Sequence, residues 1–177
     1  MRTASFPGRM LEIPLQENLR NTQKISELTA KFYRGAPMRA LGPEGQDVER
    51  IVVRDASEVE RAVGRVLHHL IKDNGVAPSD IAVLMGSARA GALRRGKRIG
   101  AFETTEDQTA EPSKVLLESI RRFKGLERLV VVLTAIDDLS ADDETALLYV
   151  GLSRARVHLV VIATDETMTR LGLAGSE

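Results

Sequence analysis

The chain of 177 residues contains no cysteine and no tryptophan. Without a thiol, this chain offers no cysteine nucleophile, no disulfide and no cysteine-ligated zinc site. Aromatic residues make up only 3% of the sequence, as four phenylalanines and two tyrosines, which leaves few surfaces on which unpaired bases could stack. The absence of cysteine is also typical of proteins of a reducing compartment, so we expect a cytoplasmic protein.

The sequence also lacks an excess of either charge and lacks long apolar runs. Lysine and arginine total 25 and aspartate and glutamate total 25, so the formal net charge is zero. A tight autonomous nucleic-acid binder is normally a basic body, so any nucleic-acid contact here must be local. No apolar run approaches the roughly 20 residues of a membrane span, and residues 1–7 lack the apolar core of a signal peptide, so no membrane partner is expected.

Apolar segments alternate with segments of helical periodicity along the chain. The length suits one domain, and the alternation predicts an α/β fold with a mainly parallel sheet and helices on both faces, in three layers. The predicted strands are residues 11–15, 51–53, 81–84, 115–117, 129–133 and 159–163, and the predicted helices are residues 22–33, 57–74 and 142–153.

The helix predicted at 57–74 has the strongest pattern. Ser57 and Glu60 have the spacing of a capping box at its start, and Asn74-Gly75 supplies a left-handed exit. Its expected buried positions are Val59, Val63, Val66, Leu67, Leu70 and Ile71.

Residues 89–98 contain five cations and no acid, and form the most basic stretch of the sequence. Within it, residues 91–97 match the first seven positions of a Walker A loop, but Arg98 stands where a Ser or Thr hydroxyl would bind magnesium. The following residues 99–113 do not have a helical pattern, and 103–112 are predicted to be a polar loop, so we do not expect a phosphate-binding Walker A loop here.

Acidic residues cluster at Asp137-Asp138 and at 142–144. A metal site is one interpretation of such a cluster. Acids in the first turn of a helix are, however, what the helix dipole favours, so we expect helix capping and no metal site.

Two segments combine cations with Gly or Ser directly before an apolar strand. The first is Arg122-Phe123-Lys124-Gly125-Leu126-Glu127, and the second is Tyr149-Val150-Gly151-Leu152-Ser153-Arg154-Ala155-Arg156. Groups of this kind at a sheet edge suit a phosphate.

The two segments resemble motifs V and VI of UvrD-like superfamily 1 DNA helicases, and Leu15-Gln16-Glu17-Asn18-Leu19-Arg20-Asn21-Thr22 resembles their motif IV. The motifs occur in the family's order. The resemblance implies a RecA-like second, C-terminal helicase domain over residues 11–164, with a lead-in at 1–10 and a tail at 165–177.

In that family, ATP with magnesium lies in a cleft between two RecA-like domains. Carried over by position, the resemblance implies that Arg20 and Arg154 reach the γ-phosphate and that Glu127 binds the ribose. Gly125 would permit close backbone approach, and Lys124 would help to hold the anion. A guanidinium is well suited to the charge that develops during phosphoryl transfer.

The resemblance also implies a contact with single-stranded DNA, through Arg121 and Arg122 together with Arg94, Arg95 and Lys97 of the basic stretch. Arg121 stands where the family pattern has histidine. An arginine keeps a cation for a DNA phosphate but lacks a titrating ring.

An intact Walker A loop and its acidic partner are not found in the sequence, so a second RecA-like domain, in cis or in trans, must supply the lysine and the magnesium ligands. We therefore expect the isolated chain to be inactive as an ATPase. One hypothesis is that it is the C-terminal half of a helicase. The alternative is a non-catalytic RecA-like binding module for nucleic acid or a protein partner. The presence of Arg20, Glu127 and Arg154 together favours the first.

Overall fold

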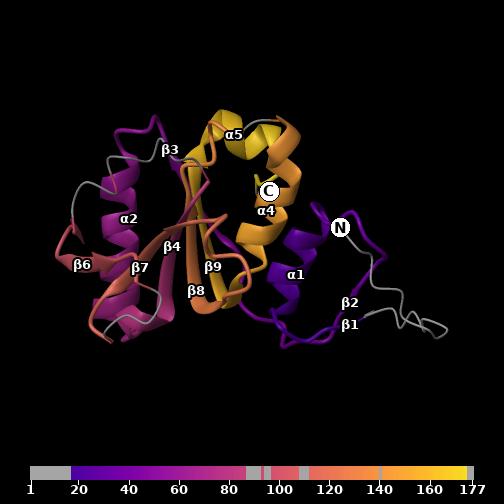
Figure 1. The fold of residues 1–177 in the computed structure, drawn as a ribbon, viewed down its shortest axis with the longest axis horizontal. Helices are drawn as coiled ribbons and strands as arrows, with labels where there is room; N and C mark the ends of the chain where they lie inside the picture. Colours follow the sequence, from indigo (N-terminus) through magenta and orange to yellow (C-terminus); the bar gives the residue numbers. More distant parts are fainter. Residues whose placement is uncertain (1–16, 87–92, 94–96, 108–111, 140, 175–177) are drawn as a thin grey trace, which may run out of the picture.

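The computed structural model describes residues 17–86, 93, 97–107, 112–139 and 141–174. The strand predicted at 11–15 lies outside these residues. A seven-stranded sheet in the order β3-β9-β8-β4-β7-β6-β5 lies at the centre of the described fold (Figure 1). Its strands are β3 (Glu49–Val53), β4 (Ile81–Met85), β5 (Arg98–Ile99), β6 (Phe102–Thr105), β7 (Val115–Ser119), β8 (Arg128–Thr134) and β9 (Ala155–Thr164).

All neighbouring strands of the sheet are parallel except β5, which runs antiparallel to β6. A separate parallel pair consists of β1 (Glu17–Asn18) and β2 (Arg39–Ala40). The described helices are α1 (Gln23–Ala30), α2 (Val59–His68), α4 (Ala141–Leu152) and α5 (Asp165–Arg170), with a π-helical turn at His69–Asp73 and a 3₁₀ turn at Pro78–Asp80. None of the helices in this part of the chain is both long and apolar enough to cross a membrane.

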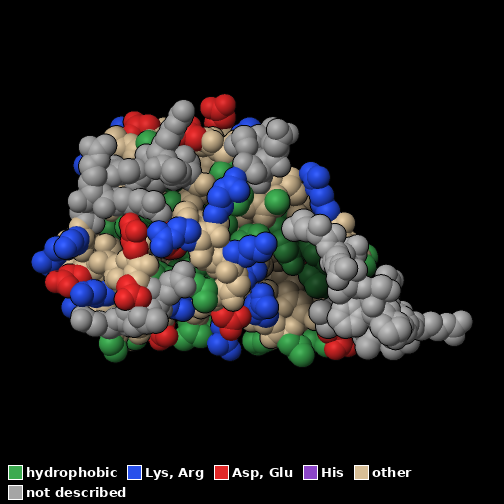
Figure 2. All heavy atoms as spheres, viewed as in Figure 1, with side chains coloured by type: hydrophobic (Ala, Val, Ile, Leu, Met, Phe, Trp, Pro, Cys, Tyr) green, Lys and Arg blue, Asp and Glu red, His purple; other side chains and the backbone are tan. Residues whose placement is uncertain are grey.

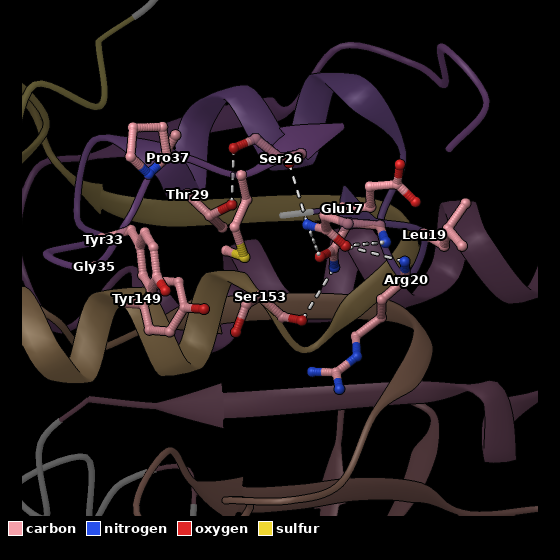
Figure 3. Close-up of a pocket in the computed structure, with 14 residues that line it drawn as sticks. Glu17, Leu19, Arg20, Ser26, Thr29, Tyr33, Gly35, Pro37, Tyr149 and Ser153 are labelled. Atoms are coloured by element: carbon pink, nitrogen blue, oxygen red, sulfur yellow. Dashed lines mark hydrogen bonds between the residues drawn. The ribbon is translucent and has the colours of Figure 1, made fainter. Parts of the chain in front are cut away.

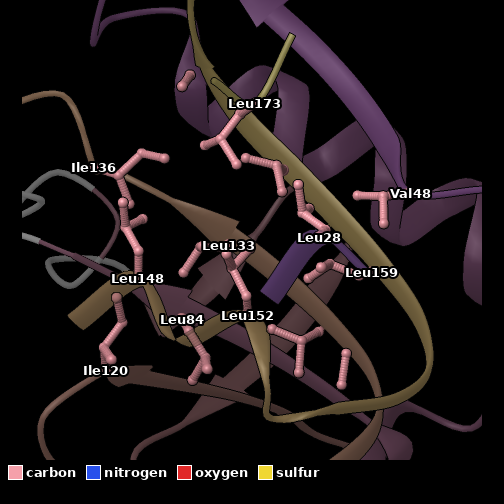
Figure 4. Close-up of a cluster of buried hydrophobic side chains, with 14 of the residues drawn as sticks. Leu28, Val48, Leu84, Ile120, Leu133, Ile136, Leu148, Leu152, Leu159 and Leu173 are labelled. Atoms are coloured by element: carbon pink, nitrogen blue, oxygen red, sulfur yellow. The ribbon is translucent and has the colours of Figure 1, made fainter. Parts of the chain in front are cut away.

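Side chains alternate between two hydrophobic cores, one on each face of the sheet. In β4, Ala82 and Leu84 face the core of α1, α4 and α5, whereas Ile81, Val83 and Met85 face the core of α2. Figure 4 shows the first of these cores, in which Leu28 of α1, Leu148 and Leu152 of α4 and Leu133 of β8 come together. The predicted three-layer α/β fold with a mainly parallel sheet is therefore confirmed. Each fully buried leucine contributes about 1.5–3 kcal/mol through its removal from water.

Helix α2 buries Val59, Val63, Val66 and Leu67 as predicted, and Leu70 is buried in the π-helical turn that follows, whereas Ile71 is only partly buried. The start of the helix differs from the prediction. The helix begins at Val59, and Glu58 at its N-cap makes no side-chain capping bond. Ser57 is engaged elsewhere, since its backbone N–H donates to Asp55 Oδ1 at 2.8 Å. The carboxylate of Glu58 accepts from the backbone N–H of Arg54 at 3.0 Å. The predicted capping box is wrong because a local turn at Asp55 competes for the serine. The predicted left-handed exit is present at Gly75, with φ of 70°.

The short strand β6 was not predicted, because residues 103–112 were expected to form a loop. Thr104 and Thr105 pair with Val115 and Leu116 of β7, and β5 adds a short hairpin arm. Phe102 is the buried apolar side chain of β6. A strand with so little apolar periodicity gives a weak sequence signal.

Residues at the C-terminal end of the described chain pack onto the first core. Met168 of α5 is 2% exposed, and Leu171 and Leu173 are also buried. The Thr164 hydroxyl accepts from the Thr167 backbone N–H and caps α5. Helix α5 is thus held to the sheet by both packing and a cap.

Candidate functional site

Three distant segments of the chain meet at the amino edge of β8 and β9. Glu127 directly precedes β8, and Arg154 directly precedes β9 after the end of α4 at Leu152. Because β8 and β9 are parallel neighbours, their starts lie at the same edge, and the Arg128 N–H donates to the Arg154 carbonyl at 3.1 Å. The turn after β1 brings Arg20 to the same place.

Glu127 lies between two arginines. Its Oε2 is 3.2 Å from Arg20 Nε, and its Oε1 is 3.5 Å from Arg156 Nε. All three side chains are about half exposed, so each ion pair contributes roughly 0–1 kcal/mol to folding. An irregularity in the β8–β9 pairing between Arg128 and Val130 adds a residue to β9 beside these charges. Because each ion pair is half exposed and weak, a more highly charged ligand can displace Glu127 from its arginines.

Arg154 is held by oxygen atoms that carry no formal charge. Its Nε donates to the Val150 carbonyl at 3.0 Å, its Nη1 to the Leu126 carbonyl at 3.1 Å and its Nη2 to Ser153 Oγ at 3.2 Å. Partial burial lowers the pKa of Arg154 below its ordinary value, and the positive charge of Arg20 lowers it further. The guanidinium nevertheless keeps its charge at neutral pH.

The local charge at this edge is therefore positive. One carboxylate, that of Glu127, lies among three cations, Arg20, Arg154 and Arg156. Figure 2 shows one face of the molecule, on which Lys and Arg side chains gather over the middle. A partly buried cation that feels a neighbouring cation is stabilised when an anion binds beside it. The arrangement favours an anionic ligand.

A cleft of about 590 Å³ opens beside Arg20, between α1, the β1–β2 segment and the end of α4. Figure 3 shows Arg20 at one end and Tyr33 beside Tyr149 at the other. The two rings have centroids 5.1 Å apart and are tilted by 35°. Ring pairs at this separation attract each other, so the tyrosines contact each other at this end of the cleft.

Two asparagines that the sequence reasoning did not single out organise the turn that carries Arg20. Asn18 Oδ1 accepts from the backbone N–H of Arg20 at 3.0 Å, and Asn18 Nδ2 donates to Asn21 Oδ1 at 3.0 Å. Asn21 in turn bonds to backbone next to Arg154. Two asparagines at this spacing are compatible with a turn that their side chains stabilise, so the sequence could have indicated the turn in advance.

The turn between β7 and β8 contains Lys124 and Gly125. Gly125 has φ of 91°, and a Cβ atom at this position would meet nothing within 4 Å. The glycine is therefore required by the left-handed backbone, and space remains for a ligand to approach it. Lys124 is exposed. Phe123 is fully buried, with the Arg128 guanidinium 5.9 Å from its ring centroid.

The predicted nucleic-acid residues lie elsewhere. Arg121 and Arg122 follow the carboxyl end of β7, whereas Glu127 precedes the amino end of β8, so residues 120–127 cross from one edge of the sheet to the other. Arg122 is exposed and lies 3.2 Å from the buried Glu118 carboxylate and 3.6 Å from that of Glu106.

The basic stretch can be placed only in part. Lys97 is exposed next to β5, while Arg94 and Arg95 lie outside the described residues. A group of three or more His, Asp or Glu side chains that could hold a metal ion is not found in the described part of the chain.

Comparison with known proteins shows what this chain is similar to in sequence and in fold. Residues 114–162, from β7 into β9, match the family model for the UvrD-like helicase C-terminal domain. The chain is also similar to the crystal structure of the C-terminal domain of a possible DNA helicase from Lactobacillus plantarum WCFS1. That similarity has a TM-score of 0.56 at 20% sequence identity and covers 82% of this chain and 86% of the other.

No protein with a curated description matches the chain. The family match covers the segments of Glu127 and Arg154, and the structural similarity shows the shared fold. The resemblance to a RecA-like helicase C-terminal domain is thus confirmed.

Proposed function

We propose that this chain is the C-terminal half of an ATP-dependent superfamily 1 DNA helicase. It works with a separate RecA-like domain that carries the Walker A loop, in cis or in trans, and ATP lies in the cleft between the two. The observation that carries the proposal is the convergence of Arg20, Glu127 and Arg154 from three distant segments at one edge of the sheet. The match of residues 114–162 to a helicase domain supports it.

Arg154 and Arg20 are proposed to bind the γ-phosphate. A guanidinium has five N–H donors, and Arg154 uses three of them for Val150, Leu126 and Ser153. The other N–H groups of its two terminal nitrogens can donate to phosphate oxygens, while the first three fix the orientation of the group. Arginines placed in this way accelerate phosphoryl transfer by roughly 10³–10⁵.

Glu127 is proposed to exchange partners when ATP binds. Arg20 is drawn from the carboxylate to the more highly charged phosphate, because the 3.2 Å ion pair is half exposed and weak. One carboxylate oxygen then becomes an acceptor for a ribose hydroxyl. Arg156 stays beside the other oxygen, 3.5 Å away.

The residues at this edge fit a triphosphate but provide no group of ligands for its metal. Magnesium would neutralise phosphate charge when bound. Since the described residues contain no cluster of His, Asp and Glu side chains suited to a metal, we assign the magnesium ligands to the Walker A domain. The lysine that contacts the phosphates is assigned to the same domain.

Single-stranded DNA is proposed to contact the opposite edge of the sheet. Arg121 and Arg122 lie there, after the end of β7, and Lys97 is proposed to join them, while Arg94 and Arg95 are assigned to DNA from the sequence alone. These contacts are local because the chain has no net charge, so binding by the chain alone should be weak and salt-dependent.

The test is steady-state ATPase kinetics of the isolated chain and of the chain combined with its Walker A domain. The isolated chain should show background activity, and the combination should hydrolyse ATP. Arg154→Ala should lower kcat by about 100-fold or more with a modest change in KM, because the arginine acts on the transition state. Arg61→Ala removes an exposed arginine from α2 and should leave kcat unchanged.

Two results would contradict the proposal. Hydrolysis by the isolated chain that Arg154→Ala abolishes would show that the catalytic groups are within this chain. If Arg154→Ala in the combined protein left kcat within a factor of about three, the non-catalytic binding module would be the better description.

A further inference from the structure

Asn21 links the two arginines of the proposed phosphate site. It follows Arg20 directly, and it is 2% exposed. Its Nδ2 donates to the carbonyl oxygen of Ser153 at 3.0 Å and to that of Ala155 at 2.5 Å. These two carbonyls belong to the neighbours of Arg154 on either side. One buried amide therefore joins the segment of one arginine to the segment of the other, across 134 positions of sequence.

The orientation of this amide is fixed by its second atom. Asn21 Oδ1 accepts from Asn18 Nδ2 at 3.0 Å, and the same Asn18 nitrogen donates to Ser26 Oγ at 3.1 Å. With Oδ1 facing a donor, Nδ2 must face the two carbonyls. A backbone bond runs parallel to this contact, from the Thr22 N–H to the Arg156 carbonyl at 3.2 Å. The turn at residues 18–22 is thus attached to the start of β9.

The attachment acts against electrostatic repulsion. Arg20 and Arg154 are close enough for the charge of the first to lower the pKa of the second. Before an anion binds, Glu127 offsets part of that repulsion from a half-exposed position. A buried amide with three hydrogen-bonded partners holds its geometry more firmly than an exposed ion pair.

We infer that Asn21 is a positioning residue that holds Arg20 and Arg154 as one preformed unit for the terminal phosphate of a nucleotide. The nature of the ligand rests on the proposed function, whereas the link between the two segments is a property of this chain. A preformed unit does not have to be ordered when the ligand binds, so Asn21 contributes to affinity without touching the phosphate.

The link can be tested on the isolated chain by NMR hydrogen exchange. Asn21→Leu keeps a similar volume and no charge but removes both donors. It should reduce the protection of the Arg154 Nε–H and the Thr22 N–H by about tenfold or more and leave the β4 amides unchanged. Asn21→Ser, which keeps one short donor, should give a smaller loss. Asn74→Leu, an exposed asparagine on another element, should have no effect at Arg154.

A second measurement uses inorganic tripolyphosphate as the probe. Asn21→Leu should weaken its binding by about fivefold or more, and should have no further effect in an Arg154→Ala background, because the asparagine acts through that arginine. Protection of Arg154 within about twofold of the parent in both Asn21 variants would overturn the inference, and so would an equal loss throughout the sheet. Lost protection in a chain that binds no tripolyphosphate even when combined with its Walker A domain would support the link and overturn the proposed function.

Discussion

The position of Glu127 between Arg20 and Arg156 predicts opposite effects of its removal on two related ligands. Glu127→Ala removes a negative charge beside the proposed phosphate site. At a separation of about 7 Å and a dielectric constant of roughly 40–80, one such charge repels a phosphate charge by about 0.5–1 kcal/mol. Tripolyphosphate, which has no ribose, should therefore bind Glu127→Ala about two- to fivefold more tightly than it binds the parent chain.

ATP should respond in the other direction. The variant loses the proposed hydrogen bond to the ribose, which is worth about 1.5–3 kcal/mol for a charged acceptor, and this loss exceeds the gain in attraction. The ratio of ATP affinity to tripolyphosphate affinity should fall by about fivefold or more. Folding stability should change by no more than about 1 kcal/mol, since both ion pairs of Glu127 are half exposed.

The assay is isothermal titration of both ligands at low and at physiological salt, since the electrostatic gain should shrink as salt rises. Glu60→Ala is the matched control, because it removes an exposed carboxylate from α2. If Glu127→Ala weakened the binding of ATP and tripolyphosphate by the same factor, the carboxylate would be organising the arginines instead of recognising the ribose. The assignment of Glu127 to the ribose would then be wrong.

Three further predictions concern other parts of the proposed site. In the chain combined with its Walker A domain, Arg20→Ala should lower kcat as Arg154→Ala does. The double variant should lose less kcat than the two single losses together, because both cations act on one phosphate. Full additivity would argue against a shared ligand. Gly125→Ala should lower the free energy of unfolding in urea by about 1–2 kcal/mol, since φ is 91° there, and an unchanged midpoint would contradict this. Single-stranded DNA should bind the isolated chain with release of about two to four counterions, and fewer should be released by the Arg121→Ala, Arg122→Ala double variant. An affinity that does not change with salt concentration would refute the proposed DNA contact.

The sequence predicted those parts of the structure that depend on local patterns. The apolar stripe of α2 and the buried strand β4 have strong periodicity, and both are present. The segments of Glu127 and Arg154, whose local sequences carry the resemblance, also lie within the residues that match the helicase family model. By contrast, the partner of Ser57 could not be predicted, because Asp55 and Glu60 are both chemically suitable and only the backbone geometry decides between them.

Contacts between distant segments were beyond the reach of sequence reasoning. Asn21 has no local feature that indicates a bond to the carbonyls of Ser153 and Ala155, because backbone oxygens are the same at every position. The ion pairs of Glu127 were also not predictable, since many arginines of the chain could have reached it. Only the fold determines that Arg20 and Arg156 are the ones that do.

The segment 120–127 joins the proposed nucleotide edge of the sheet to the proposed DNA edge, and it is attached along its length. The Ile120 N–H donates to the Met85 carbonyl at 3.0 Å, Phe123 is fully buried, and the Leu126 carbonyl accepts from Arg154. A closely packed connection of this kind cannot lengthen or shorten without losing contacts. We therefore expect ATP hydrolysis at one end of the segment to be coupled to DNA movement at the other. A substitution that loosens only the middle of the segment should then allow ATP hydrolysis without movement along the DNA.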